Sequence, residues 1–291
     1  MSNYGVGGIR RRGWSRWLQA GVLGAWSAVA VMPLLWMVYA SLESDQELGA
    51  SLVPTPGLPR FSHWVTVLSS QSVLPMPVSR YLANTFIVAI PATAVAVVAG
   101  ALGAYGMVRF RPKGSGLLQA FVIFLLPVPV FAVMVPVYLY MHSLGLTNSR
   151  VGLVLVWSGF NVSFALIVMR GFFSRLPTDI IEASLVEGCT EVGAFRRVVL
   201  PLAVAPVTSA ALLIFIGLWG EFPMAVVMIQ NQQLMTIQPA LTTLAGVGPG
   251  GTGSLSLELS ALAVTNVVPI GVFLLVRRRI FDAIVGRLGS S

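Results

Sequence analysis

The chain has 291 residues, of which 56% are apolar and only 10% are charged, and its formal net charge is +8. Soluble globular domains carry about a quarter charged residues, so this balance excludes an ordinary soluble domain and indicates a protein embedded in lipid. A nucleic-acid-binding protein would display its arginines on a polar, soluble face, whereas here the basic residues form short clusters between long apolar runs.

Six segments reach the roughly 20 apolar residues that a helix needs to cross the hydrocarbon core of a bilayer. They cover residues 17–40, 84–108, 117–141, 151–169, 203–228 and 259–276. The first follows an arginine cluster, as a cleaved signal peptide would, but its apolar run is longer than a typical signal. We therefore expect an all-α, polytopic membrane protein with six transmembrane helices.

The basic residues predict the orientation of these spans. With the N-terminus in the cytoplasm, 15 of the 18 Lys and Arg residues are cytoplasmic, and only Arg60, Arg80 and Arg150 lie outside. Because cytoplasmic loops are enriched in Lys and Arg, we expect a multi-pass protein of the cell membrane with both termini in the cytoplasm. The long outer loops would then be residues 41–83 and residues 229–258, the second of them polar and glycine-rich.

Two spans carry features of a packed helix bundle. In the second span, small residues recur at every fourth position: Ala92, Ala96, Gly100 and Ala104. This pattern lets another helix approach closely, although a plain bias toward Ala and Gly would also produce it. In the third span, Pro127, Pro129 and Pro136 must interrupt or kink the helix, either along a translocation pathway or as a structural kink.

The sequence offers no catalytic or metal-binding motif. The single cysteine, Cys189, has no disulfide partner in the chain, and the two histidines, His63 and His142, lie far apart. Without a Walker motif we expect neither a bound cofactor nor an enzyme. Glu221, near the end of the fifth span, is either functional or solvated at the interface. A proton- or sodium-coupled transporter usually needs several buried carboxylates, so the energy for transport is expected to come from elsewhere.

Between the fourth and fifth spans, residues 170–202 carry a helical pattern of their own. Pro177 suits a helix start, with Asp179 as the expected N-cap and Glu182 three residues later. Gly188 is placed to end this helix, and Thr190 to cap a second helix that runs to the membrane.

The first of these two helices carries the small residues Ala183, Ser184 and Gly188. Small side chains would let the cleft of a partner protein close on the helix backbone. On physical grounds alone, an amphipathic helix that lies at the membrane interface explains the pattern equally well.

The same segment resembles the EAA motif of ABC-importer permeases, which reads E-A-A, three residues, G, nine residues, I, one residue, L-P. The matching positions are Glu182, Ala183, Ser184, Gly188, Val198, Leu200 and Pro201, with Ser184 for Ala and Val198 for Ile. Further stretches resemble the second permease subunit of maltose-type carbohydrate importers, at residues 33–41, 84–85, 104–110, 145–148, 170–177 and 219–222. The ending, residues 286–291, departs from the family, so the resemblance assigns it no role.

The resemblance implies a cytoplasmic coupling helix that docks into a separate ATPase. When this ATPase closes on bound ATP, the coupling helix would transmit the movement to the transmembrane spans. It implies three partners: a second permease subunit in a heterodimer, a cytoplasmic ATPase dimer that binds the ATP, and an extracytoplasmic solute-binding protein. The ATPase-coupling residues that carry over are Glu182, Ala183, Ser184, Gly188, Leu200 and Pro201. It identifies no substrate-contacting residue.

We expect three regions along the chain. Residues 1–79 would hold the cytoplasmic N-terminus, the first span and the long outer loop; residues 80–282 would form the ABC type-1 permease domain, with its coupling loop at about 174–201; and residues 283–291 would form a cytoplasmic tail. The resemblance implies a sugar as the solute, and the same machine for a glycerophosphodiester or peptide is the alternative. A third hypothesis is a secondary transporter or channel that acts without partners.

Overall fold

The computed structural model describes residues 12–50, 59–69, 74–244 and 254–288, with side chains from residue 17 to residue 277. Within these ranges the secondary structure is helical, without a strand, which confirms the predicted all-α fold. The principal helices are α1 (Arg12–Ala40), α4 (Val78–Arg109), α7 (Arg150–Phe173), α11 (Val204–Trp219) and α14 (Leu255–Leu288).

Four helices, α1, α4, α7 and α14, are long and apolar enough to cross a membrane individually, and two bent pairs raise the number of candidate spans to six. In the first pair, α5 (Ser115–Leu125) meets α6 (Val130–Ser143) at 105°. In the second, residues 191–202 meet α11 at 74°. The predicted fifth span, residues 203–228, is α11 followed by a separate helix, α12 (Pro223–Met228).

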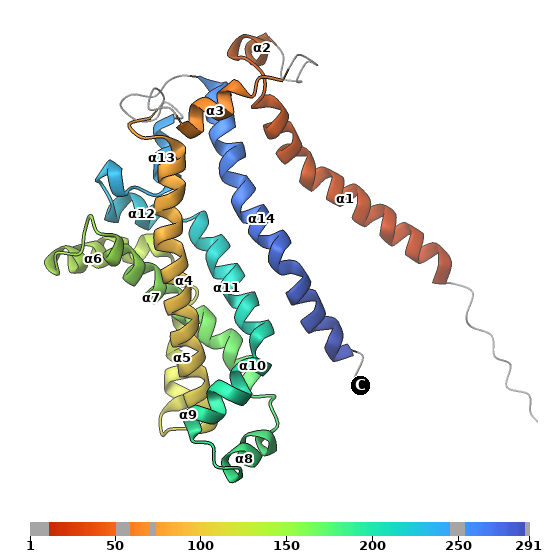
Figure 1. The fold of residues 1–291 in the computed structure, drawn as a ribbon, viewed down its shortest axis with the longest axis vertical. Coiled ribbons are helices and arrows are strands. Elements are labelled where there is room, and N and C mark those ends of the chain that lie inside the picture. Colours follow the sequence, from red (N-terminus) through yellow and green to blue (C-terminus); the bar gives the residue numbers. More distant parts are fainter. Residues whose placement is uncertain (1–11, 51–58, 70–73, 245–253, 289–291) are drawn as a thin grey trace, which may run out of the picture.

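Prolines account for the break between α5 and α6. Pro129 is the N-cap of α6 in an extended conformation (φ −69°, ψ 133°), and the helical pattern stops at Leu125. Proline lacks an amide donor and clashes with the preceding turn, so the predicted interruption is confirmed at Pro127 and Pro129, whereas Pro136 lies inside α6. Figure 1 shows α6 lying across the direction of α4.

The helices α4 and α7 run side by side in the same direction and form the centre of the molecule (Figure 1). Ala92, Ala96, Gly100 and Ala104, the predicted stripe of small residues, are all buried. A Cβ atom added to Gly100 would lie only 2.6 Å from Cβ of Ala165 and 2.7 Å from the backbone nitrogen of Leu166. The stripe therefore lets the two backbones approach, as the four-residue spacing predicted.

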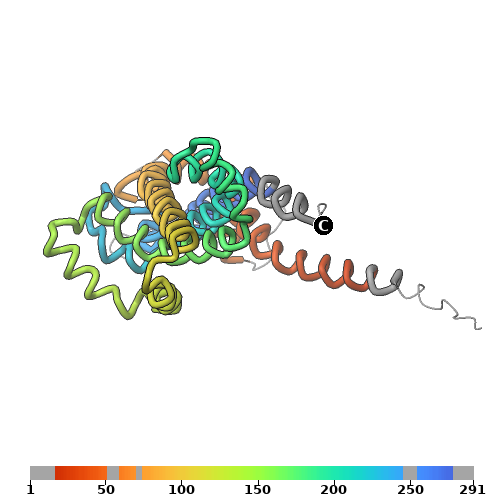
Figure 2. The backbone as a smooth tube through the Cα atoms, turned by 90° about the horizontal axis from the view of Figure 1, so that it is seen from below, coloured from red at the N-terminus to blue at the C-terminus, as the bar shows by residue number. Residues whose placement is uncertain are grey.

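By contrast, α1 is almost free of contacts. Of its residues 17–40 only Ala40, at the C-terminal end, is buried, and Figures 1 and 2 show the helix leading away from the other helices. It joins them only near its C-terminal end, where the Ser260 hydroxyl of α14 donates to the carbonyl of Ser41 at 2.9 Å. In the chain as described, this helix therefore leaves a large apolar surface for lipid or for another protein.

Short elements cover the end of the bundle at which α1 ends and α4 begins (Figure 1). They are α2 (Asp45–Ala50), α3 (Ser62–Ser69), the 3₁₀ turn η2 (Gln232–Leu234) and α13 (Ile237–Leu244). The predicted polar loop at residues 229–258 thus contains a helix, because Ile237, Leu241 and Leu244 recur at helical spacing and are buried. Its glycine-rich part, residues 246–253, lies outside the described residues.

At the opposite end of the bundle, α14 continues to Leu288. Most of the predicted tail, residues 283–291, is therefore the end of this helix, and residues 289–291 lie outside the described part of the chain.

The close approach of α4 and α7 predicts opposite effects for one added methyl group at two glycines of α4. Gly100→Ala should destabilise the protein by about 1–3 kcal/mol, because the methyl group would overlap with Ala165. Gly106→Ala, which meets nothing within 4 Å, should be neutral or stabilise the helix by up to about 1 kcal/mol. Thermal unfolding of the purified protein in detergent, followed by tryptophan fluorescence, measures both. Equal midpoints for the two variants would contradict the packing described here.

Candidate functional site

Four short helical elements connect α7 to α11 and lie beyond the adjacent ends of α4 and α7 (Figure 1). They are α8 (Thr178–Val186), α9 (Glu191–Ala194), the π-helical turn η1 (Phe195–Val199) and α10 (Leu200–Leu202). The predicted helical pattern of residues 170–202 is thus confirmed.

The first helix of this segment, α8, begins one residue after Pro177, which is its N-cap in an extended conformation (φ −60°, ψ 129°). Asp179 lies inside the first turn, so the prediction that Asp179 is the N-cap is wrong. The fixed φ of Pro177 suits the start of the helix, so Pro177 takes the N-cap position. The carboxylate of Asp179 lies in the first turn, where the positive end of the helix dipole stabilises its negative charge.

Gly188 ends α8 as predicted. Its φ of +94° lies in the left-handed region, which side chains disfavour and glycine adopts freely. The amides of Gly188 and Cys189 donate to the carbonyls of Leu185 and Ser184, each at 3.0 Å. These two bonds form the Schellman arrangement that satisfies the last carbonyls of a helix. Apart from its two chain neighbours, no described residue has an atom within 4 Å of a Cβ placed at position 188.

The second part of the segment begins at Thr190, whose hydroxyl oxygen accepts a hydrogen bond from the amide of Gly193 at 3.1 Å. The predicted cap is therefore confirmed. The helix does not run on regularly to the membrane, because it changes to a π-helical turn and then to α10 before the bend of 74° into α11. Leu200 and Pro201 lie exposed at this bend.

The inward face of α8 packs on the rest of the chain through Ile181 and Ser184, of which Ser184 is only 7% exposed. The Ser184 hydroxyl donates to the carbonyl of Ile181 at 2.7 Å, so it is satisfied within the helix. Ser184 therefore lies on the buried side of α8, away from the exposed residues Ala183 and Gly188. A docking surface on this helix would not include the side chain of Ser184.

The outward face of α8 carries the remaining predicted positions of the helix. Glu182, Ala183 and Gly188 are exposed, and so are two apolar residues that the sequence did not single out, Ile180 and Val186. Val186 is 89% exposed. The outward face thus combines small residues with an uncovered apolar surface.

Arg109, at the end of α4, joins the segment to the main bundle. Its Nη2 lies 2.9 Å from Oε1 of Glu191 at the start of α9, and its Nε also donates to this carboxylate at 3.3 Å. The hydroxyl of Tyr105, one turn earlier, donates to Glu191 at 3.4 Å, and Nη1 of Arg109 lies 4.0 Å from Glu182 of α8. One guanidinium group therefore contacts carboxylates on both helices of the segment.

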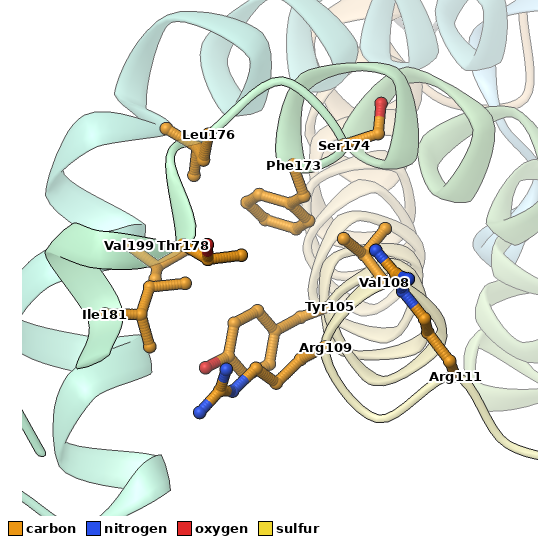
Figure 3. Close-up of a pocket in the computed structure, with 10 residues that line it drawn as sticks. All are labelled: Tyr105, Val108, Arg109, Arg111, Phe173, Ser174, Leu176, Thr178, Ile181 and Val199. Carbon is orange, nitrogen blue, oxygen red and sulfur yellow. The ribbon is translucent and has the colours of Figure 1, made fainter.

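Aromatic rings surround the same junction. The ring of Tyr105 lies 4.8 Å from that of Phe195 in η1 and 6.0 Å from that of Phe173 at the end of α7. Figure 3 shows Tyr105 and Arg109 facing Ile181 and Val199 across a pocket of about 240 Å³. The segment is thus attached to α4 and α7 by both charge and apolar contact.

Sequence reasoning did not identify the contact between Arg109 and Glu191. The two residues are 82 positions apart, and Arg109 was considered only as one of the cytoplasmic basic residues and as part of the family-like stretch 104–110. The available signal was the place of Arg109 as the first charged residue after a long apolar helix, on the same side as the acidic residues of the segment.

Glu221 has a structural explanation. Its carboxylate accepts hydrogen bonds from the backbone amides of Met224 and Ala225, at 2.7 and 3.0 Å, and from the indole nitrogen of Trp157 at 3.0 Å. It therefore caps the first turn of α12 and ties it to α7. Within the described residues, no group of three or more His, Cys, Asp and Glu side chains could hold a metal ion.

A family model described as "Binding-protein-dependent transport system inner membrane component" matches residues 77–288. The diacetylchitobiose uptake system permease protein NgcG of Streptomyces coelicolor is 30% identical over 261 residues, which cover 89% of this chain and 84% of that protein. The trehalose/maltose transport system permease protein MalG of Thermococcus litoralis is 28% identical over 244 residues, 83% of this chain and 84% of that protein.

The fold is also similar to a solved structure. A chain in the crystal structure of a bacterial ABC transporter involved in the import of the acidic polysaccharide alginate aligns with a TM-score of 0.77. The alignment covers 94% of this chain and 100% of that chain, at 20% sequence identity. At this identity the similarity establishes the arrangement of the helices.

The contacts of Arg109 predict a local effect of its removal. Arg109→Gln should increase hydrogen–deuterium exchange of the backbone amides in α8 and α9, because Glu191 and Glu182 lose their common partner. Exchange in the centres of α4 and α7 should stay unchanged. Arg175→Gln is the control, because it removes an equal charge from an exposed residue near α8. It should change exchange neither in α8 and α9 nor in the centres of α4 and α7. Unchanged protection of α9 in the Arg109→Gln variant would show that the ion pair does not hold the segment.

Proposed function

The chain belongs to the family of binding-protein-dependent transport system inner membrane components, and from this premise we propose that it is the permease subunit of an ABC importer for a sugar. The relatives named for diacetylchitobiose and for trehalose and maltose support a sugar as the solute. Members of this family are transport components and not enzymes, as the sequence led us to expect.

The outward face of α8 is the observation that carries the coupling proposal. Exposed apolar residues on a short helix outside the bundle mark a surface that a partner covers. Ala183 and Gly188 beside Val186 would let the backbone of this partner approach closely, and Glu182 would offer a charge to it. We assign the partner as the cytoplasmic ATPase dimer, which would bind the ATP that this chain has no motif to bind.

Two connections would pass a movement of α8 to the bundle. One is Arg109, whose contacts with Glu191 and Glu182 join α8 and α9 to the end of α4. The other is the bend at Leu200 and Pro201, which leads directly into α11. In this proposal Ser184 acts through packing against the chain itself, and the other five predicted coupling positions are exposed to the partner or to the membrane surface.

The remaining partners follow from the same proposal. A second permease subunit would cover part of the apolar surface of α1 and complete the pathway in a heterodimer. A solute-binding protein would deliver the sugar at the end of the bundle opposite α8. The α8 end would face the cytoplasm with both termini, in agreement with the distribution of basic residues. Residues 1–79 would then precede the permease domain, predicted at 80–282.

The only cysteine of the chain, Cys189, lies directly after α8 and tests this orientation without any mutation. A maleimide that does not cross membranes should label Cys189 in inverted vesicles and not in right-side-out vesicles. In a Cys189→Ser background, Val65→Cys on the exposed surface of α3 should show the reverse pattern. Labelling of Cys189 from the exterior would contradict the proposed orientation.

The geometry of Gly188 allows the docking role to be separated from helix capping. Asparagine tolerates the left-handed conformation, so Gly188→Asn adds a side chain at the proposed contact with little backbone strain. We expect solute uptake by the reconstituted importer to fall about tenfold, because overpacking at a contact typically costs about 1–3 kcal/mol.

The matched control is Gly114→Asn. Gly114 also has a positive φ, of +89°, and open space around its Cβ, but it lies in the connection between α4 and α5. This variant should transport like the unmodified protein. If Gly188→Asn, present in the membrane in equal amounts, transported as well as Gly114→Asn, the docking assignment would be wrong.

A further inference from the structure

Two of the three arginines outside the basic clusters, Arg80 and Arg150, line a single pocket. Its volume is about 570 Å³, and it lies where the first turns of α4 and α7 meet η2, at the end of the bundle opposite α8. The polar residues that line it are Arg80, Asn84, Arg150, Gln232 and Gln233. No Asp or Glu is among its described lining residues, so the pocket carries an uncompensated positive charge.

A neutral amide holds Arg150 in place. Nη2 of Arg150 donates to Oδ1 of Asn84 at 2.8 Å, and Nδ2 of Asn84 donates to the carbonyls of Gln233 and Met235 at 2.9 and 3.0 Å. The Nε of Arg150 is buried and has no hydrogen-bond partner in the described part of the chain. A buried donor without an acceptor is costly, so the hydrogen bonds to Asn84 leave the charge of Arg150 only partly compensated.

Arg80 adds a second, exposed guanidinium group to the pocket, and no acidic partner for it lies among the described residues. Arg60, at the same end of the bundle, differs in this respect because its Nη2 lies 3.6 Å from Oε1 of Glu47. The helix dipoles of α4 and α7, which both begin beside the pocket, favour negative charge there as well.

We propose that Arg80 and Arg150 receive a carboxylate side chain of the solute-binding protein when it docks on the outer end of α4 and α7. This inference rests on the proposed function, which places that end outside the cell. A guanidinium group binds a carboxylate through two parallel hydrogen bonds, which fixes orientation as well as position. The pocket opens beside helix ends, with Arg80 exposed, where an arriving protein makes its first contact.

The test uses the complete importer, with its second permease and ATPase, in nanodiscs. The Kd of the solute-binding protein for this complex is measured at several salt concentrations, together with the stimulation of ATP hydrolysis. Arg80→Gln should raise Kd about tenfold and weaken its salt dependence, because a charge contact at an interface is lost. Arg80→Lys, which keeps the charge without the two-pronged geometry, should give an intermediate Kd.

Arg60→Gln is the matched control, since it removes the same charge from the same end of the protein, and its Kd should change less than about twofold. ATP hydrolysis without the binding protein should be the same in all variants. Equal Kd values for Arg80→Gln and Arg60→Gln would overturn the inference. The inference would also be overturned if Arg80→Gln left the Kd unchanged but impaired the uptake of an acidic solute, since the pocket would then bind the solute. If the unmodified importer neither bound nor responded to the binding protein, the proposed function itself would fail.

Discussion

The close contact between α4 and α7 is the constraint on which both proposed functional ends of this protein depend. Gly100 and Ala165 leave no room for an additional methyl group, so the two helices are held as one parallel pair. Arg109 and Phe173 lie at one end of this pair, and Arg80 and Arg150 at the other, about 40 Å away at 1.5 Å per residue. A tightly packed pair of helices can transmit a displacement between its ends, because packed cores deform little.

In the proposed function the chain transmits a movement, and a separate ATPase supplies the energy. Glu221 is the carboxylate that could have served ion coupling. Its oxygens accept hydrogen bonds from two backbone amides and one indole nitrogen. The outward face of α8 is uncovered, whereas the next two elements, α9 and η1, are joined to α4 by a bidentate ion pair and an aromatic contact. A force applied to α8 from outside the chain would therefore act on α4 and, through the bend before α11, on a second helix.

Much of this architecture could be predicted because it depends on local patterns. Apolar runs indicated the spans, Gly188 and Thr190 marked helix ends, and the stripe at Gly100 indicated close packing. Other features depend on tertiary contacts that spacing does not reveal. The direction of α6 after Pro129, the burial of Ser184, and the contact between Arg109 and Glu191 belong to this class. The N-cap of α8 was misplaced because a proline boundary and a carboxylate cap give similar local patterns.

The central claim, that α8 is the contact with a separate ATPase, is tested most directly by cross-linking in native membranes. A photoreactive benzoylphenylalanine in place of Val186 should form an adduct with the nucleotide-hydrolysing subunit after irradiation, since this position is exposed on the outward face. The same group in place of the buried Ile181 should form adducts within the chain itself. Adducts of position 186 with lipid alone, or with proteins that do not hydrolyse nucleotides, would contradict the account.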